Sequence, residues 1–230
     1  DHRRRMGQFI LTGSAVPDQE AERLREHSGT GRFAWLTMRP MTLFESGESN
    51  GLVSLTDLFS TPDKILHPNL LNLRQIAYLI CRGGWPIAVD LPEEAALSQA
   101  FDYYDAVTKE DITRIDGIKR SSEKVQRLMR SYARHQGTQA SIATIKEDLR
   151  YNDSSTLNED TIASYLDALR KIFVIEDMPA WNPNLRSKTA IRTTDTRYFI
   201  DPSIATAALG LGPNDLINDL NTMGFLFESL

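Results

Sequence analysis

The segment NEDTIASYLDALRKIFVIED, residues 158–177, contains a complete helix signal followed directly by a run typical of a β-strand. Asn158 is a favourable N-cap, and the acids at 159 and 160 suit the positive end of the helix dipole. Apolar residues then recur at helical spacing, at Ile162, Tyr165, Leu166, Leu169 and Phe173. Residues 173–176 have the composition of an extended segment. The pattern predicts a helix that packs on a core and leads into a strand.

Two further helical segments precede this helix, and a second extended run follows it. Apolar residues recur at helical spacing from Val125 to Ala133, and residues 142–149 form a shorter helical segment. The run Arg197–Asp201 could pair with residues 173–176 as a hairpin. Three helices and a hairpin are the order of a winged helix, whose third helix can enter the DNA major groove.

A winged helix would contact DNA through the exposed side of its third helix and through basic residues near the hairpin. The candidate nucleic-acid-binding residues are Thr161, Ser164, Arg170, Lys171, Arg186, Lys188 and Arg192. We expect Asp167 and Ala168 to share that exposed side, where the carboxylate would repel phosphates. Since a fold of this type also serves as a packing module, a purely structural role stays open.

A row of cations on the first of the three helices offers a second basic surface. Its members are three or four residues apart and would lie side by side: Lys124, Arg127, Arg130 and Arg134. The row favours a polyanion or an acidic partner, and the alternative is an ordinary solvated helix face.

The amino-terminal part predicts two strands and then a small helical lobe. The apolar run Phe9–Leu11 stops at Thr12, Gly13 and Ser14, and residues 33–38 form a second run that ends before a proline. Polar groups beyond a strand can reach a ligand in an open α/β sheet, although hydroxyls there are also ordinary turn chemistry. Residues 54–104 have helical periodicity instead, interrupted by the glycines at 83 and 84.

Composition limits the class of protein. The chain has 230 residues, 41% of them hydrophobic and 25% charged, which is typical of a globular protein. A net charge of -5 argues against wholesale binding to polyanions. Cys81 is the single cysteine, so an intrachain disulfide is excluded, and the four histidines lack ligand spacing, so we expect no metal site. Without a membrane-spanning run or a secretory signal, the sequence predicts a cytoplasmic protein.

Six segments together resemble one known family. They are GQFILTGSA, HSGTGRFAWLTMRPMTLFESG, CRGGWP, TIASYLDALRKIFVIEDMPAW, RYFIDPSIATAALG and MGFLFESL. In this order they are similar to bacterial and archaeal AAA-type ATPases that carry a C-terminal domain of unknown function, usually a winged helix followed by a restriction-endonuclease-like lobe. The resemblance covers nearly the whole chain. Because the sequence begins without Met and stops in an apolar run, we expect an internal fragment of such a protein.

The resemblance implies roles for three residues. Thr12 and Ser14 fall at the sensor position beside the nucleotide phosphates, without an indication of which hydroxyl faces the nucleotide. Arg32 matches a Gly-Arg pair before the last core strand, where it would act as an arginine finger or stabilise a turn. ATP and Mg²⁺ are implied for the intact parent. The chain lacks a G-x-x-x-x-G-K-[ST] segment and an Asp-Glu strand end, so the fragment itself should be inactive and bind neither.

The expected fold class is an α/β remnant plus a mostly α part. Residues 1–45 would hold the last strands of a P-loop ATPase core, 46–108 a helical lid, 109–215 a winged-helix domain, and 216–230 the start of a truncated nuclease-like domain. Two alternatives stay open: a non-enzymatic DNA-binding regulator and a protein-interaction module. The candidate partners are DNA and a second copy of the chain, with no membrane.

Overall fold

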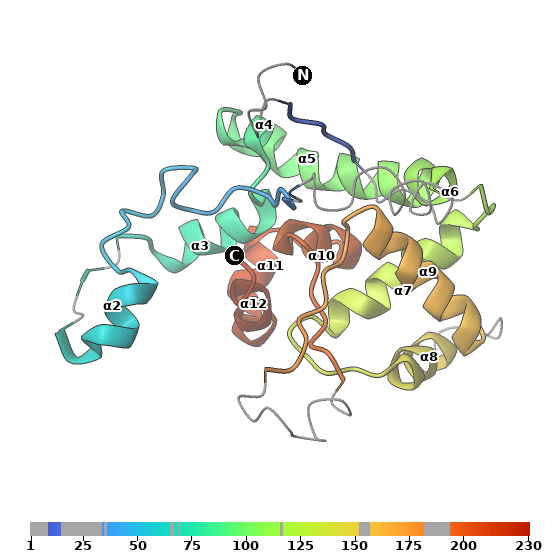
Figure 1. Ribbon diagram of the computed structural model, residues 1–230. Helices are drawn as coiled ribbons and strands as arrows, with labels where there is room; N and C mark the ends of the chain where they lie inside the picture. The colour runs from blue at the N-terminus through green and yellow to red at the C-terminus, as the bar shows by residue number, and fades with distance from the viewer. Residues whose placement is uncertain are drawn as a thin grey trace, which may run out of the picture.

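The protein is mostly helical in the computed structural model, which describes residues 9–14, 34, 36–64, 67–68, 70–115, 117–151, 157–181 and 194–230 (Figure 1). A short helix α2 and a 3₁₀ turn η1 precede the main helices, and η2 is a π-helical turn at the end of α5. The described elements are α2 (Leu55–Ser60), η1 (Pro62–Lys64), α3 (Leu73–Arg82), α4 (Pro86–Val89), α5 (Glu93–Ala106), η2 (Val107–Asp111), α6 (Ile112–Arg114), α7 (Ser122–Arg134), α8 (Ile142–Tyr151), α9 (Glu159–Lys171), α10 (Pro202–Leu209), α11 (Pro213–Asn218) and α12 (Leu220–Phe227).

Helix α10 lies at the centre of the core. It packs against α7, α5 and α3, and Figure 1 shows it between these helices. Seven of its eight residues are buried, and most are small, so the neighbouring helices approach it closely. Beside it, Phe199 meets Tyr132 of α7 edge to face, with ring centroids 5.1 Å apart. The core therefore joins helices that are far apart in the sequence as well as consecutive pairs.

The helices predicted from residues 122–177 are confirmed. All five apolar positions of α7 predicted from Val125 to Ala133 are buried. Helix α9 begins after Asn158, whose side chain accepts a hydrogen bond from the Thr161 amide at 2.7 Å. Its predicted stripe is buried at Ile162, Tyr165, Leu166 and Leu169, and Phe173 is half-buried. The cap residue and the apolar stripe are sufficient to predict these helices because both signals lie in the helical segment itself.

The predicted α/β fold class is wrong, because the described residues contain no β-strand and no sheet. Residues 9–14 and 36–41 have no regular secondary structure. Phe9, Ile10 and Leu11 are 80–89% exposed, and Leu36 is 94% exposed. A strand requires a partner for its backbone groups, and no described segment pairs with these runs. The described structure is therefore not a remnant of a P-loop ATPase core.

The predicted hairpin is reduced to two isolated antiparallel bridges, Ile175 with Phe199 and Met178 with Thr196. Along one edge the second run pairs with residues 174–178, but between the two bridges the Tyr198 amide makes no backbone hydrogen bond to the Glu176 carbonyl, so the bridges do not join into a ladder. Along its other edge the second run bonds to the turn after α7. The Arg197 amide donates to the Thr138 carbonyl at 2.9 Å, and the Phe199 amide donates to the Gln136 side chain at 3.0 Å. The winged-helix expectation is corrected accordingly: its three helices α7, α8 and α9 are present, but the described part of its hairpin is not a pair of strands.

No helix in the described ranges is both long enough and apolar enough to cross a bilayer. The proposed limits of the domains stay predictions.

Candidate functional site

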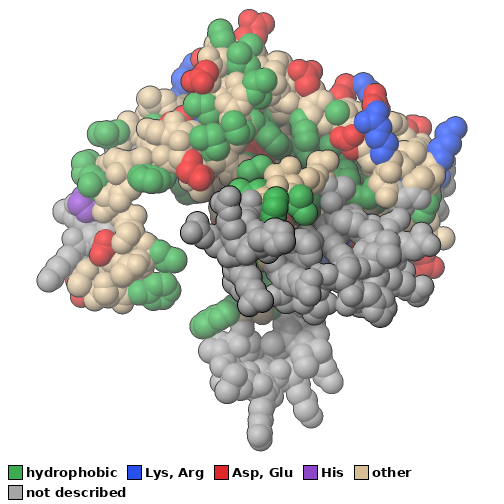
Figure 2. All heavy atoms as spheres, turned by 45° about the horizontal axis from the view of Figure 1, so that its top comes forward, with side chains coloured by type: hydrophobic (Ala, Val, Ile, Leu, Met, Phe, Trp, Pro, Cys, Tyr) green, Lys and Arg blue, Asp and Glu red, His purple; other side chains and the backbone are tan. Residues whose placement is uncertain are grey.

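Residues 51–64, which we call the arm, expose several large apolar side chains. The arm contains α2 and η1, and none of its described residues is buried. Its large apolar side chains are between 45% and 84% exposed: Leu52, Val53, Leu55, Leu58 and Phe59. In Figure 1 the arm projects from the body beyond α3, and in Figure 2 its apolar side chains border an open hollow. Most large apolar side chains of a folded protein are buried, so this concentration of exposed ones is unusual.

Local hydrogen bonds, rather than packing, form helix α2. Ser54 is its N-cap, and the Ser54 hydroxyl accepts from the Asp57 amide at 3.1 Å and donates to the Asp57 carboxylate at 2.6 Å. Leu55, Leu58 and Phe59 stand at positions i, i+3 and i+4 and share one side of the helix, whereas Asp57 lies on the opposite side. The arm therefore presents an apolar face on α2, and the one charged residue of α2, Asp57, lies on the other side of the helix.

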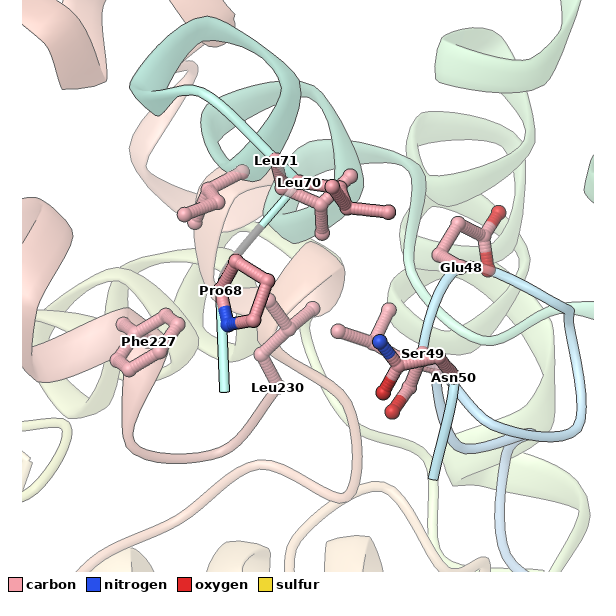
Figure 3. Close-up of a pocket in the computed structure, with 10 residues that line it drawn as sticks. Glu48, Ser49, Asn50, Pro68, Leu70, Leu71, Phe227 and Leu230 are labelled. Atoms are coloured by element: carbon pink, nitrogen blue, oxygen red, sulfur yellow. The ribbon is translucent and has the colours of Figure 1, made fainter. Parts of the chain in front are cut away.

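An apolar pocket of about 270 Å³ lies at the root of the arm (Figure 3). Three parts of the chain build its wall: the segment before the arm, the segment that leads into α3, and the end of α12. Its apolar lining consists of Leu43, Pro68, Leu70, Leu71, Ile76, Phe227 and Leu230. No side chain of α2 lines it. The pocket and the apolar face of α2 are thus separate surfaces of the same chain.

The carboxylate at the edge of this pocket is already neutralised. Glu48 pairs with the buried guanidinium of Arg82 and accepts a hydrogen bond from Ser46. Burial by itself would raise the pKa of Glu48, but the hydrogen bonds from Arg82 and Ser46 outweigh it and hold the pKa below its usual range. Glu48 is therefore a structural anion, and the accessible wall is suited to apolar groups.

The two glycines after α3 fasten the pocket wall to the core. The Gly84 carbonyl accepts from the Met41 amide at 2.7 Å, and the Gly84 amide donates to the buried Asp201 carboxylate at 2.8 Å. A Cβ on Gly84 would lie 2.2 Å from the Met41 oxygen, and one on Gly83, which has a φ of +72°, would lie 2.3 Å from Asp201 Oδ1. The sequence predicted only that these glycines end a helix. Gly83 does end α3, and both also allow this close approach.

Asp201 is the centre of that junction. Besides the hydrogen bond from the Gly84 amide, the Asp201 carboxylate accepts hydrogen bonds from the Ser203 amide at 2.9 Å and from the Ser203 hydroxyl at 2.6 Å. Trp85 Nε1 donates a hydrogen bond to the same hydroxyl at 2.9 Å. Burial raises the pKa of Asp201, while these hydrogen bonds and nearby Arg82 act in the opposite direction. The segments CRGGWP and RYFIDPSIATAALG, quoted above for the resemblance, therefore meet in the fold through Asp201.

The predicted nucleotide-binding residues do not form a site in the described structure. Thr12 and Ser14 are exposed and follow no strand, so the physical reason for placing them beside a phosphate is lost. Arg32 lies outside the described residues. The expected role of all three stays a prediction derived from the resemblance.

The predicted DNA-binding side of α9 has its cations engaged in ion pairs. Arg170 donates to Asp177 at 2.5 Å, and Lys171 pairs with Asp167 at 2.9 Å. Ser164 is exposed, Thr161 is half-buried beside the cap, and Ala168, predicted to be exposed, is 1% exposed. The remaining candidates, Arg186, Lys188 and Arg192, lie outside the described residues. The described face of α9 is thus nearly balanced in charge.

Asp177 organises a second buried network that sequence reasoning missed. Its side chain is 5% exposed and accepts hydrogen bonds from Arg170, from Arg197 at 2.7 Å, and from the Tyr132 hydroxyl. Burial, followed by the neighbouring Asp177 charge, raises the pKa of Tyr132. The network ties α7 to α9 and to the bridged segments, so Arg170 has a structural role.

The cation row of α7 is exposed as predicted. Arg127 pairs with Glu123 at 2.7 Å, and Arg134 pairs with Asp148 of α8 at 3.0 Å. Lys124 and Arg130 are also exposed. The row retains the charge needed to attract an anionic partner.

Neither metal chemistry nor thiol chemistry is suggested by the described side chains. The described residues hold no group of three or more His, Cys, Asp or Glu side chains placed to bind one ion. Cys81 is buried, and burial raises its pKa to about 12, which suppresses the reactive thiolate.

The arm is the feature that sequence reasoning placed but did not interpret. SLTDLF lies within residues 54–104, where the periodicity predicts a helical lobe, and its apolar residues at i, i+3 and i+4 indicate a contact surface without indicating whether the contact is internal.

One comparison with known proteins gives a match. A family model described as a domain of unknown function, DUF8612, matches residues 73–215, the part of the chain that runs from α3 into α11. No curated protein and no solved structure shows significant similarity to the chain.

Proposed function

The chain belongs to the DUF8612 family, and we propose that it is a protein-docking module that binds its partner through the arm and the pocket. Among the functions considered from the sequence, this is the interaction module. The observation that carries the proposal is the apolar face of α2, exposed beside an apolar pocket.

The free energy of apolar burial supports docking. Burying one Leu or Phe side chain contributes about 1.5–3 kcal/mol, and the arm exposes five large apolar side chains to water. Helix α2 has six residues, far below the roughly 12–15 at which isolated helices become even marginally stable. A partner that covers the apolar face would therefore also stabilise the helix.

The chemistry of the pocket favours an apolar partner over a charged substrate. Seven of its ten lining residues are apolar, its carboxylate is paired with Arg82, and its other polar residues, Ser49 and Asn50, are uncharged. Binding pockets are mostly apolar, with a few polar groups that fix the orientation of the ligand. A helix or loop with apolar side chains suits this wall better.

Site-specific photo-crosslinking tests the proposal while the partner is still unidentified. A benzophenone amino acid replaces Phe59 in the arm and, as a matched control, Phe101 on α5, which is 43% exposed. We expect a discrete protein adduct in irradiated cells from position 59 and none from position 101. No adduct at position 59, or the same adducts at both positions, would contradict the docking proposal.

Nucleic-acid binding is a second candidate, favoured by the exposed cation row of α7. It predicts DNA binding that falls steeply with added salt and weakens when Lys124 and Arg130 are changed to Glu. Arg74→Glu, the same charge change at an exposed position of α3, serves as control. These positions are better probes than Arg170, whose replacement also breaks the Asp177 network. Binding that ignores salt and all three changes would remove this candidate.

The ATPase of the intact parent, its ATP and Mg²⁺, and a cytoplasmic location stay predictions. The 230 residues contain no phosphate loop, so we expect at most weak binding of MgATP to this chain. Calorimetry that finds micromolar affinity would overturn that expectation.

A further inference from the structure

We propose that His135 is an acid-sensitive latch: when its ring takes up a proton, the turn after α7 loosens and releases the pocket wall that the end of α12 forms. The inference rests on the proposed docking function and adds the regulation of that site. Docking is then strongest at neutral pH and weakens in acid. Three features carry the inference: an imidazole placed against protonation, a turn that depends on it, and a contact from that turn to the pocket.

The His135 ring has a buried nitrogen without a hydrogen bond. His135 is the C-cap of α7, and its side chain as a whole is half-buried. Its Nε2 atom is buried and has no hydrogen-bond partner among the described residues. Most buried polar atoms in proteins are hydrogen-bonded, so such an exception calls for an explanation. A neutral imidazole tolerates this position, whereas a protonated one would bury a donor and a charge without an acceptor.

The charged groups near the ring do not compensate for its burial. Asp148 of α8 favours the protonated form and Arg134 of α7 disfavours it, and these two side chains pair with each other at 3.0 Å. In the bridged segments beside the turn, the charge of Arg197 is balanced by Asp177 at 2.7 Å. Although a helix C-terminus favours a cation, burial is the largest influence and lowers the pKa of His135 below its usual value.

The direction of the pH effect follows from this lowered pKa. The unfolded chain binds the proton at a higher pH than the folded chain does, so folding with a neutral ring is favoured in neutral solution. The contribution of the neutral ring to stability is complete above the unfolded value of about 6.5 and is lost as the pH falls towards the folded value.

The turn after α7 is built on the backbone of His135. The His135 carbonyl accepts hydrogen bonds from the Thr138 amide at 3.0 Å and from the Thr138 hydroxyl at 2.8 Å. The same turn holds the second bridged segment, because the Gly137 amide donates to the Arg197 carbonyl and the Arg197 amide donates to the Thr138 carbonyl, both at 2.9 Å. A charged ring that moves out to reach water therefore displaces the backbone that supports these bonds.

Gln136 connects this turn to the pocket wall. The residue is 2% exposed, and its side chain accepts from the Phe199 amide at 3.0 Å and donates to the Ser229 hydroxyl at 2.9 Å. Ser229 lies between Phe227 and Leu230, which line the pocket (Figure 3). The residue next to His135 thus holds the segment that forms one wall of the pocket.

A glycine lets the end of α12 rest directly on the turn. Gly137 has a φ of +71°, and a Cβ there would lie 3.1 Å from a carboxylate oxygen of Glu228 and 3.2 Å from the Phe225 ring. The Glu228 carboxylate, the charged group of this segment at the turn, accepts from the Tyr198 hydroxyl at 3.0 Å. A change in the turn is therefore felt by the end of α12 through direct contact as well as through Gln136.

An NMR titration of the purified chain tests the first feature. We expect the His135 ring to titrate with a midpoint below about 6.5. A midpoint at or above that value would overturn the latch, because the folded chain would then accept the proton without a cost.

Amide hydrogen exchange tests the release of the wall. Between about pH 7.5 and about pH 5, the protection factors of the Phe199 and Leu230 amides should fall at least about threefold. The Gly83 amide, which donates to the Leu79 carbonyl at the end of α3, should keep its protection. An equal fall at all three amides would place the effect on the whole fold and overturn the latch.

Two histidine variants assign the acid response to one ring. His135→Phe cannot be protonated, and the fall in protection at Phe199 and Leu230 should disappear. His67→Phe removes an exposed imidazole and should keep the response of the parent chain. His135→Gln, which does not titrate either, repeats the test if circular dichroism shows that the phenylalanine variant is unfolded. A response that survives the change at position 135 would overturn the latch.

Photo-crosslinking separates this inference from the function on which it rests. With the benzophenone at position 59 in a cell extract, the adduct yield should fall between about pH 7.5 and about pH 5.5 in the parent chain and hold in His135→Phe. An equal fall, or none, in both chains would overturn regulation through His135 and keep the docking module. The expected exchange at Leu230 without any specific adduct would overturn docking and keep the latch as a property of the fold.

Discussion

The described residues before α3 leave their large apolar side chains exposed or half-buried, whereas the residues after α3 bury many of theirs. No described residue before Ala77 is buried, whereas the core from Ala77 to Leu226 contains fully buried Leu, Ile, Met, Phe and Tyr side chains. Phe59 in the arm is 84% exposed and Phe199 in the core is 2% exposed. The difference lies in the presence of a partner, since both regions contain apolar residues at helical spacing. An apolar stripe indicates a contact surface, and only the rest of the molecule decides whether that contact is internal.

The largest expected difference between the two regions is the cost of truncating a leucine. Leu166→Ala in α9 removes a side chain that is 1% exposed and should lower the free energy of unfolding by about 2–5 kcal/mol. Leu55→Ala in the arm removes one that is 71% exposed and should change it by less than about 0.5 kcal/mol. Urea denaturation of both variants, at a concentration where the chain is monomeric, measures the difference. Equal costs would show that the arm is packed internally.

The junction between the two regions should be the next most sensitive point. Asp201→Ala leaves the buried amides of Gly84 and Ser203 without their acceptor and should cost about 3 kcal/mol. Asp219→Ala removes an exposed N-cap of the same residue type and should cost about 1 kcal/mol. Thermal unfolding of both variants gives the comparison. If Asp201→Ala were no worse than Asp219→Ala, the junction would contribute little to the core.

Within the core, the cap of α9 should have a moderate effect. Asn158→Ala removes the acceptor for the Thr161 amide and should lower the free energy of unfolding by about 1 kcal/mol. Asn158→Asp keeps an acceptor at the same place and should be nearly neutral. Urea denaturation distinguishes the two, and an equal loss in both would show that the cap is not what stabilises this end.

The smallest effect is expected where an exposed segment is tied to the core by charge. Arg39 pairs with Glu176, and its hydrogen bond holds the pKa of Glu176 below the usual range. The pair is solvent-exposed, so its contribution should be below about 1 kcal/mol. Because the folded pKa is lowered, this contribution is complete above the unfolded value near 4.3 and is lost as the pH falls through the folded value.

An NMR titration of the Glu176 carboxyl measures this tie directly. The midpoint should lie below about 4.3 in the parent chain and rise towards that value in Arg39→Gln, while Arg39→Lys should give an intermediate midpoint. The same midpoint in all three chains would mean that the segment at Arg39 is not held by Glu176.

The helices around α9 could be predicted from the sequence because their signals are local. Asn158, the acids after it and the apolar stripe all lie in one continuous segment, and the caps and periodicity act on that segment alone. The same holds for the stripe of α7.

The predicted strands failed because pairing is not local. Residues 9–11 have a composition suited to a strand, but a strand forms only against another, and no such partner is among the described residues. The run at 197–201 has a partner in residues 174–178, yet the two segments form only two isolated bridges. Its other edge bonds to Thr138 and Gln136, a contact that no periodicity in the sequence reports.

The candidate site was the least predictable part. The exposure of Phe59 depends on where α2 stands relative to the core, and the pocket combines residues from Leu43 to Leu230. The importance of Gly84 depends on Met41 and Asp201, which are 43 and 117 positions away in the chain. Sequence reasoning found the apolar residues of the arm but had no means to see that they lack an internal partner.

The close approach at Gly84 also makes the pocket depend on the core. The Gly84 carbonyl holds the Met41 amide, and Asp201, the N-cap of α10, holds the Gly84 amide. The segment that carries Leu43 and Glu48 is therefore anchored to α10 through a single glycine, so a substitution that displaces Gly84 should alter the pocket wall together with the core.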